Sequence, residues 1–143
     1  MLFSQARGRK VVSIDTAATV GNIRSYIVDA VAQQIVGLSL NKTPHSGNVL
    51  LWNDITGFGA DAITVASAQL IIEPDERISQ LDGKAHAMVG KQVLNTEGQR
   101  IGAVADVDFD TATGRINHLI LAEESVPGTK LLGVGSYAVV VRT

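Results

Sequence analysis

An internal repeat constrains this chain more than any other feature of its sequence. Residues 21–40 align without a gap to residues 102–121, and five of the 20 aligned positions are identical. Two further blocks repeat in the same order, residues 8–11 with 90–93 and residues 62–65 with 138–141. Because a repeated unit forms the same small structure each time, the chain is predicted to hold two copies of one module. The identical pairs are Gly21/Gly102, Asp29/Asp110, Ile35/Ile116, Leu38/Leu119 and Leu40/Leu121.

Each copy has the residue pattern of β-strands, because Val, Ile and Thr dominate short apolar runs that turn residues separate. In the second copy, residues 91–95, 101–109 and 115–121 are predicted strands. Residues 96–98 form a hairpin turn in which glycine provides a positive φ. The sequence therefore predicts an all-β fold. The predicted structural turn residues are Gly21, Asp29, Gly98, Gly102, Asp110 and Gly114.

A break in the alternation of apolar residues predicts where each copy bends. Val107 and Phe109 share one face of the predicted strand, whereas Val104 has the opposite parity. All three can point inward only if one extra residue lies near Ala105 and Asp106, which is a β-bulge. The first copy shows the same change of parity. We therefore expect both copies to curl at the same place.

The segment between the copies is predicted to be a short helical linker. Pro74 lies early in residues 73–81, acidic residues occupy the first turn, and Gly83 follows as a stop signal. A second short helical turn is expected at residues 52–55. These signals divide the chain into copy 1 (residues 1–72), a linker (residues 73–84) and copy 2 (residues 85–143).

The second copy resembles the PRC-barrel family. Two other domains are similar to this family: the cytoplasmic domain of the reaction-centre H subunit and the C-terminal domain of a ribosome maturation factor. The resemblance implies two tandem, six-stranded, partly open barrels that contact proteins or RNA. It brings no catalytic residues and no cofactor. The first copy departs from the pattern at Ala17 and Ala18, where a turn glycine is expected, and at Ser25, which replaces Asp106. The residues that carry the resemblance are Gly90, Lys91, Val93, Gly98, Ile101, Gly102, Val104, Asp106, Val107, Phe109, Asp110, Gly114, Ile116 and Leu119.

Composition excludes several classes of protein. The chain has no cysteine, so disulfides and thiolate chemistry are excluded. Its net charge of −2 shows no overall basic footprint for nucleic acid. The longest apolar stretch, residues 62–72, is too short to span a membrane, and no signal sequence begins the chain. We expect a soluble, cytoplasmic protein.

Three alternating aspartates are the most suggestive chemical motif. Asp106, Asp108 and Asp110 have the spacing that opens a calcium loop, but Thr111 and Asn117 stand where that loop needs a glycine and a carboxylate. The preferred interpretation places Asp106 and Asp108 on the solvent face of a strand and Asp110 at a turn.

The histidines provide only a weak metal hypothesis. His45, His86 and His118 lack the spacing of a metal-binding pair, and His86 and His118 could meet only through tertiary folding. The sequence therefore predicts no metal, no cofactor and no small-molecule substrate.

Two groups of residues are candidates for contact with a partner. Leu50, Leu51 and Trp52 are predicted to form an exposed apolar face, on which homodimerisation is a hypothesis; burial of Trp52 in the core or between the barrels is the other interpretation. The only basic cluster holds Arg7, Arg9 and Lys10, and it could contact phosphate or an anionic membrane, although a solvated strand edge is the commoner explanation.

Two functions follow from these expectations. The first is a non-catalytic protein-interaction or scaffold module that docks on a protein complex, with the cytoplasmic face of the membrane as a candidate location. The alternative is an accessory factor that associates with RNA or the ribosome. An enzyme is the least supported class.

Overall fold

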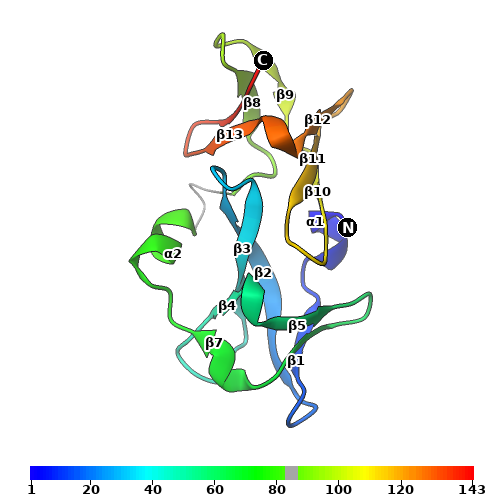
Figure 1. Ribbon diagram of the computed structural model, residues 1–143, viewed down its shortest axis with the longest axis vertical. Coiled ribbons are helices and arrows are strands. Elements are labelled where there is room, and N and C mark those ends of the chain that lie inside the picture. Colours follow the sequence, from blue (N-terminus) through cyan, green and yellow to red (C-terminus); the bar gives the residue numbers. More distant parts are fainter. Residues whose placement is uncertain (83–86) are drawn as a thin grey trace.

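The computed structural model describes residues 1–82 and 87–143 of the chain. Strands make up 46% of the structure and helices 14%, which confirms the all-β prediction (Figure 1). The first copy occupies the lower part of Figure 1 and the second copy the upper part, with the N-terminus beside the second copy.

The first copy is built on one sheet with the strand order β5-β6-β1-β2-β3-β4-β7. A short helix, α1, precedes the sheet, and the 3-10 helices η1 and η2 lie before β5 and β7. The predicted helical turn at residues 52–55 is thus confirmed as η1. The bounds are α1 Phe3–Ala6, β1 Lys10–Ser13, β2 Thr19–Asp29, β3 Gln34–Asn41, β4 Val49–Leu51, η1 Trp52–Asp54, β5 Ile55–Phe58, β6 Ile63–Val65, η2 Ala68–Leu70 and β7 Ile71–Ile72.

The second copy repeats this arrangement in two smaller sheets, with the strand orders β10-β11-β12 and β13-β14-β8-β9. Its 3-10 helix η4 lies before β13, as η1 lies before β5 in the first copy. The bounds are β8 Gln92–Asn95, β9 Arg100–Ala103, β10 Asp106–Phe109, β11 Ile116–Ile120, β12 Ser125–Pro127, η4 Gly128–Lys130, β13 Leu131–Val134 and β14 Val139–Val141.

The strand pairing shows that the two copies share one topology. In the first copy β1 runs parallel to β6 and antiparallel to β2, and in the second copy β8 runs parallel to β14 and antiparallel to β9. Other antiparallel pairs also correspond, β2–β3–β4 to β10–β11–β12 and β5–β6 to β13–β14, whereas β4–β7 has no counterpart among the described residues of the second copy. The long strand β2 is therefore equivalent to β9 and β10 together.

Both copies bend where the change of parity predicts a bulge. The pairing of β2 with β3 shifts register between Ile23 and Ser25. At the equivalent place in the second copy the strand is interrupted between Ala103 and Asp106, so that β9 and β10 join different sheets. The extra residue redirects the strand and curls the sheet around the core.

Four of the predicted turn residues have that role. The Asp29 carboxylate accepts the backbone N–H of Val31 at 3.0 Å, and the equivalent Asp110 carboxylate accepts that of Ala112 at 2.7 Å. Gly98 and Gly114 have φ values of 79° and 77°, which non-glycine residues rarely adopt. Ala17, which replaces the expected glycine in the first copy, takes the same left-handed conformation with φ of 54°.

Gly21 and Gly102 are not turn residues, and that part of the prediction is wrong. Gly21 lies within β2 and Gly102 within β9. A Cβ on Gly21 would lie 3.2 Å from Leu40, and a Cβ on Gly102 would lie 2.8 Å from the equivalent Leu121. The glycines therefore make room for a core leucine in each copy. The spacing of residues in the sequence does not distinguish this packing role from a role in a turn.

The predicted linker contains the helix α2 (Glu76–Leu81). The Asp75 carboxylate caps it by accepting the backbone N–H of Ile78 at 2.8 Å. Ile78 packs on the outer side of the first sheet, against Ile27 and Val49. Gly83, the predicted stop, lies outside the described residues. The division at residues 72/73 and 84/85 stays a prediction.

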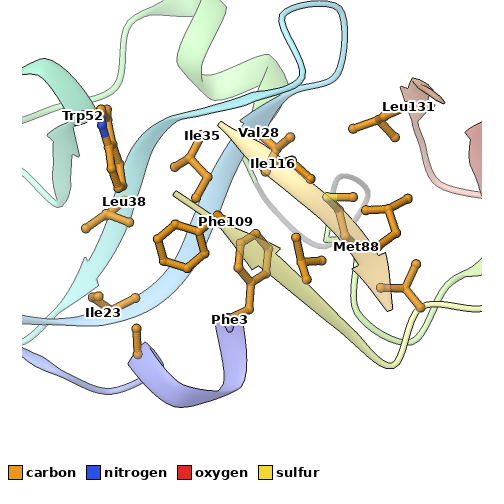
Figure 2. Packing of buried hydrophobic residues seen from close by; sticks show 14 of the residues in the cluster. Phe3, Ile23, Val28, Ile35, Leu38, Trp52, Met88, Phe109, Ile116 and Leu131 are labelled. Atoms are coloured by element: carbon orange, nitrogen blue, oxygen red, sulfur yellow. The ribbon is translucent and has the colours of Figure 1, made fainter. Parts of the chain in front are cut away.

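The larger of two hydrophobic clusters in the described residues runs through both copies. Its centre is Phe109 of the second copy, which is 1% exposed. The centroid of its ring lies 5.4–6.2 Å from the centroids of four aromatic rings of the first copy, those of Phe3, Tyr26, Trp52 and Phe58. Figure 2 shows Phe109 between core residues of the two copies. Neither copy therefore closes its core alone.

A short strand bridge joins equivalent residues of the two copies. Gln34 pairs with Arg115 in an antiparallel bridge, and these two residues occupy the same position in the repeat. The Ile35 N–H donates to the Gly114 carbonyl at 2.8 Å, and the Ile116 N–H donates to the Gln33 carbonyl at 3.0 Å. Because these bonds are reciprocal, the copies are related by a local two-fold axis, as in a symmetric dimer.

A substitution at Gly128 tests the close packing of η4 against β11. A Cβ at this position would lie 1.9 Å from the Ile116 carbonyl oxygen, which is backbone and cannot rotate away. We expect Gly128→Ala to lower the free energy of unfolding by about 2–3 kcal/mol in urea titrations. Gly133→Ala is the matched control, because its Cβ meets nothing within 4 Å, and its effect should stay within about 0.5 kcal/mol. Equal effects of the two substitutions would contradict this packing.

Candidate interaction surfaces

The predicted apolar face of Leu50, Leu51 and Trp52 is buried, and the prediction of an exposed patch there is wrong. Leu50 is 0% and Trp52 7% exposed, and Leu51 is half-buried. The Trp52 ring stacks on Phe58. It also lies against Gly114 of the second copy, because a Cβ added to Gly114 would be 2.9 Å from the ring. Trp52 therefore packs between the copies. These three residues offer no contact face for a homodimer.

The predicted basic cluster is divided by the fold. Arg9 is half-buried, and its guanidinium donates to the Gly59 carbonyl at 2.8 Å and to the Gln5 carbonyl at 3.2 Å. Arg7 and Lys10 are exposed. Arg9 thus connects the N-terminal segment to the β5–β6 hairpin, and its charge is not presented to phosphate together with its two neighbours.

The three aspartates each have a separate structural partner. Asp106 accepts hydrogen bonds from the backbone and hydroxyl of Ser4 in α1. Asp108 accepts the Met1 ammonium at 3.0 Å, and Asp110 caps its turn. Asp106 and Asp108 lie along the partly exposed face of β10, as the preferred interpretation predicted. Their bonds to α1 and Met1, which hold the N-terminus on the second copy, were not predicted.

The surroundings of Asp108 lower the pKa of its carboxyl group. Partial burial by itself raises this pKa, but hydrogen bonding and attraction from the Met1 ammonium, with further bonds from Asn117 and His118, outweigh it and hold the pKa below the ordinary value of 3.8. The Asp108 carboxylate therefore stays ionised to a lower pH than an ordinary aspartate.

The histidines are not gathered into one site in the described part of the chain. His45 lies 3.0 Å from the Ala68 carbonyl, His118 lies 3.7 Å from the Asp108 carboxylate, and His86 lies outside the described residues. Residues 1–82 and 87–143 contain no group of three or more metal-ligating side chains. In the same residues, no helix has the length and apolarity needed to cross a bilayer.

A hollow of about 280 Å³ lies between the copies, beside α1. Its floor is apolar and includes Phe3, Tyr26 and Met88, and exposed Arg7 and Arg24 lie at its rim. The Tyr26 hydroxyl donates to the Phe3 carbonyl at 2.9 Å, and burial raises the pKa of Tyr26 above its ordinary value, so the phenol stays neutral. Its polar group is thus engaged in holding α1.

Two exposed apolar side chains of the second copy lie on and beside the outer face of its four-stranded sheet. Tyr137 is 75% exposed and forms a shallow hollow with Leu94, Val134 and Val140, which we call the Tyr137 surface. Leu132, on the neighbouring strand β13, is 45% exposed. The register equates Val140 with Thr64 of the first copy, so at this one position only the second copy is apolar. The uninterrupted apolar run at residues 138–141 is the sequence signal that could have revealed this face.

Acidification tests the contact between Asp108 and the N-terminus. Because the folded-state pKa of Asp108 is lowered, its stabilising contribution is present above pH 3.8 and is lost as the pH falls through the folded-state value. We expect Asp108→Asn to reduce stability at neutral pH and to flatten the loss of stability at acidic pH, measured as thermal midpoints from pH 2 to 7. Asp61→Asn, at an exposed position, is the control. A parallel curve for Asp108→Asn would refute the contact.

Comparison with known proteins identifies the second copy. The family model that describes the PRC-barrel domain matches residues 83–142. A search of curated proteins found no match to the chain. The matched residues include both sheets of the second copy, with the bulge, the Asp110 turn and the strand glycine described above. The segment of residues 83–142 is therefore identified as a PRC-barrel domain.

Proposed function

We propose that this protein is a non-catalytic interaction module that docks on a protein complex through its second copy. The family match supports an interaction role in general. We also propose that the first copy is a second barrel of the same type, because its strands pair in the same pattern. Within this proposal the protein is peripheral to the cytoplasmic face of the membrane. The reaction-centre domain that is similar to this family is also cytoplasmic.

The Tyr137 surface is the observation on which the proposal depends. The aspartates of β10 and the Arg9 guanidinium are engaged in holding the N-terminal segment, so they are not arranged for chemistry on a substrate. In contrast, Tyr137 and Leu132 expose apolar area at the four-stranded sheet, where contact with another protein would remove it from water. No described feature favours the RNA-associated alternative, since the basic cluster is divided.

Affinity capture from native cells tests the proposal. We expect the tagged wild-type protein to retain a defined set of proteins and the double variant Tyr137→Ser, Leu132→Ser to retain at least tenfold less of that set. Ile14→Ser is the control, because Ile14 is 55% exposed in the turn that follows β1 of the first copy.

Two results would contradict the proposal. One is equal capture by the double variant and the wild type. The other is enrichment of ribosomes that disappears after nuclease treatment or at high salt, which would support the RNA-associated alternative. Sedimentation of the captured set with membranes, reversed by a salt wash, tests the peripheral location.

A further inference from the structure

The two copies differ at the edge of their fourth strand. β4 and β12 are equivalent, because Leu50 pairs with Leu38 and Val126 pairs with Leu119, and Leu38 and Leu119 are matched positions of the repeat. The residues before these strands also correspond. The Asn48 carbonyl accepts the Leu40 N–H, and the Glu124 carbonyl accepts the Leu121 N–H, both at 2.8 Å.

In the first copy, β7 covers this edge. It pairs antiparallel with β4, placing Ile72 opposite Val49 and Ile71 opposite Leu50. The Asn48 N–H donates to the Ile72 carbonyl at 3.0 Å. The Ile71 side chain is 2% exposed and belongs to the core. The first barrel is therefore closed at this end by a short apolar strand from the linker.

In the second copy, the equivalent edge is open. β12 is the last strand of its sheet, and no described residue pairs with its outer edge. The Glu124 N–H, equivalent to that of Asn48, has no hydrogen-bond partner among the described residues. A hollow of about 260 Å³ lies beside β12, and Ile101, Val126 and Val141 form its apolar part. These residues are the equivalents of Val20, Leu50 and Val65.

The surroundings of the hollow define the chemistry of an occupant. On the outer side of the first sheet, apolar Ile27 and Val49 are covered by α2. Their equivalents in the second copy are polar, Asp108 and Ser125, so that face needs no helix and the unpaired edge of β12 fits a strand alone. The side chains at the rim of the hollow include those of Lys130 and Arg142 against one acidic side chain, that of Glu124. A strand with an acidic residue beside its apolar residues would complement this charge.

We propose that the edge of β12 is a docking site for an extended peptide segment of a partner protein. The segment adds antiparallel to β12, accepts the Glu124 N–H at one of its carbonyl oxygens, and seats a β-branched apolar side chain in the hollow, as Ile71 does in the first copy. Strand addition of this kind obtains affinity from backbone bonds and specificity from the side-chain pocket. This inference rests on the proposed interaction function and specifies a second contact besides the Tyr137 surface.

A peptide with the sequence of residues 67–73, SAQLIIE, blocked at both ends, is the probe. We expect its addition to the full-length protein to cause saturable NMR shifts at the amides of Glu124, Ser125 and Val126. The peptide with the Ile71→Asp change should bind at least tenfold more weakly. Ile101→Lys in the protein should weaken binding to the same extent, whereas Ile14→Lys, at an exposed position of the first copy, should leave it unchanged.

A second arm guards against a misfolded variant or a weakly binding free peptide. Residues 68–73 are appended to Thr143, which is equivalent to Ser67 before η2. We expect the thermal midpoint to rise by about 3 °C or more, and the same extension with the Ile71→Asp change to give no rise.

The inference is overturned if the peptide causes no shifts near β12 and the extension leaves the midpoint unchanged. Binding that is equal for the two peptides would also overturn it. If the peptide does not bind but partner proteins are still captured through the Tyr137 surface, this inference alone is contradicted. If the peptide binds but affinity capture retains no protein, the proposed function is contradicted instead.

Discussion

The antiparallel bridge between Gln34 and Arg115 sets the geometry on which the rest of the structure depends. It joins the same position of both copies, so each copy meets the other with the same surface. Once this register is fixed, Phe109 must lie among the aromatic rings of the first copy, and Trp52 must lie against Gly114. The side chain of Gln33 adds two bonds across the interface, to the Thr129 and Leu131 carbonyls at 2.8 and 2.9 Å. Two small copies with modest cores of their own thereby share one larger core.

The differences between the copies follow from what covers each of them. The linker supplies β7 and α2 to the first copy, and its outer face is correspondingly apolar at Ile27 and Val49. The second copy receives the N-terminal segment instead, and its equivalent face is polar, with Asp108 holding the Met1 ammonium. Exposed apolar area in the second copy is found elsewhere, at Tyr137 and Leu132. Because its first copy is covered and its second copy is open, the protein is suited to bind a partner through the second copy.

The sequence predicts those parts of the fold that local physics determines. The turn caps at Asp29 and Asp110 depend on a side chain and the next few backbone amides, and the bulge depends on apolar parity along one strand, so both can be found without coordinates. The roles of Leu50 and Trp52 depend on how the copies meet, which no local pattern encodes. The packing role of Gly102 depends on its contact with Leu121, which is distant in sequence. Local patterns therefore do not distinguish this glycine from a turn glycine. The open edge of β12 is visible only by comparing the two copies in three dimensions.

Calorimetric unfolding of a matched pair of variants tests most directly whether the copies form one structural unit. Leu38 and Leu119 are equivalent residues, one in each copy, and both are 0% exposed. Leu38→Ala and Leu119→Ala should each reduce stability by about 2–5 kcal/mol. The shared core predicts one transition in which the calorimetric and van't Hoff enthalpies agree, shifted as a whole to lower temperature by either variant. Two transitions, each lowered only by the substitution in its own copy, would contradict this account.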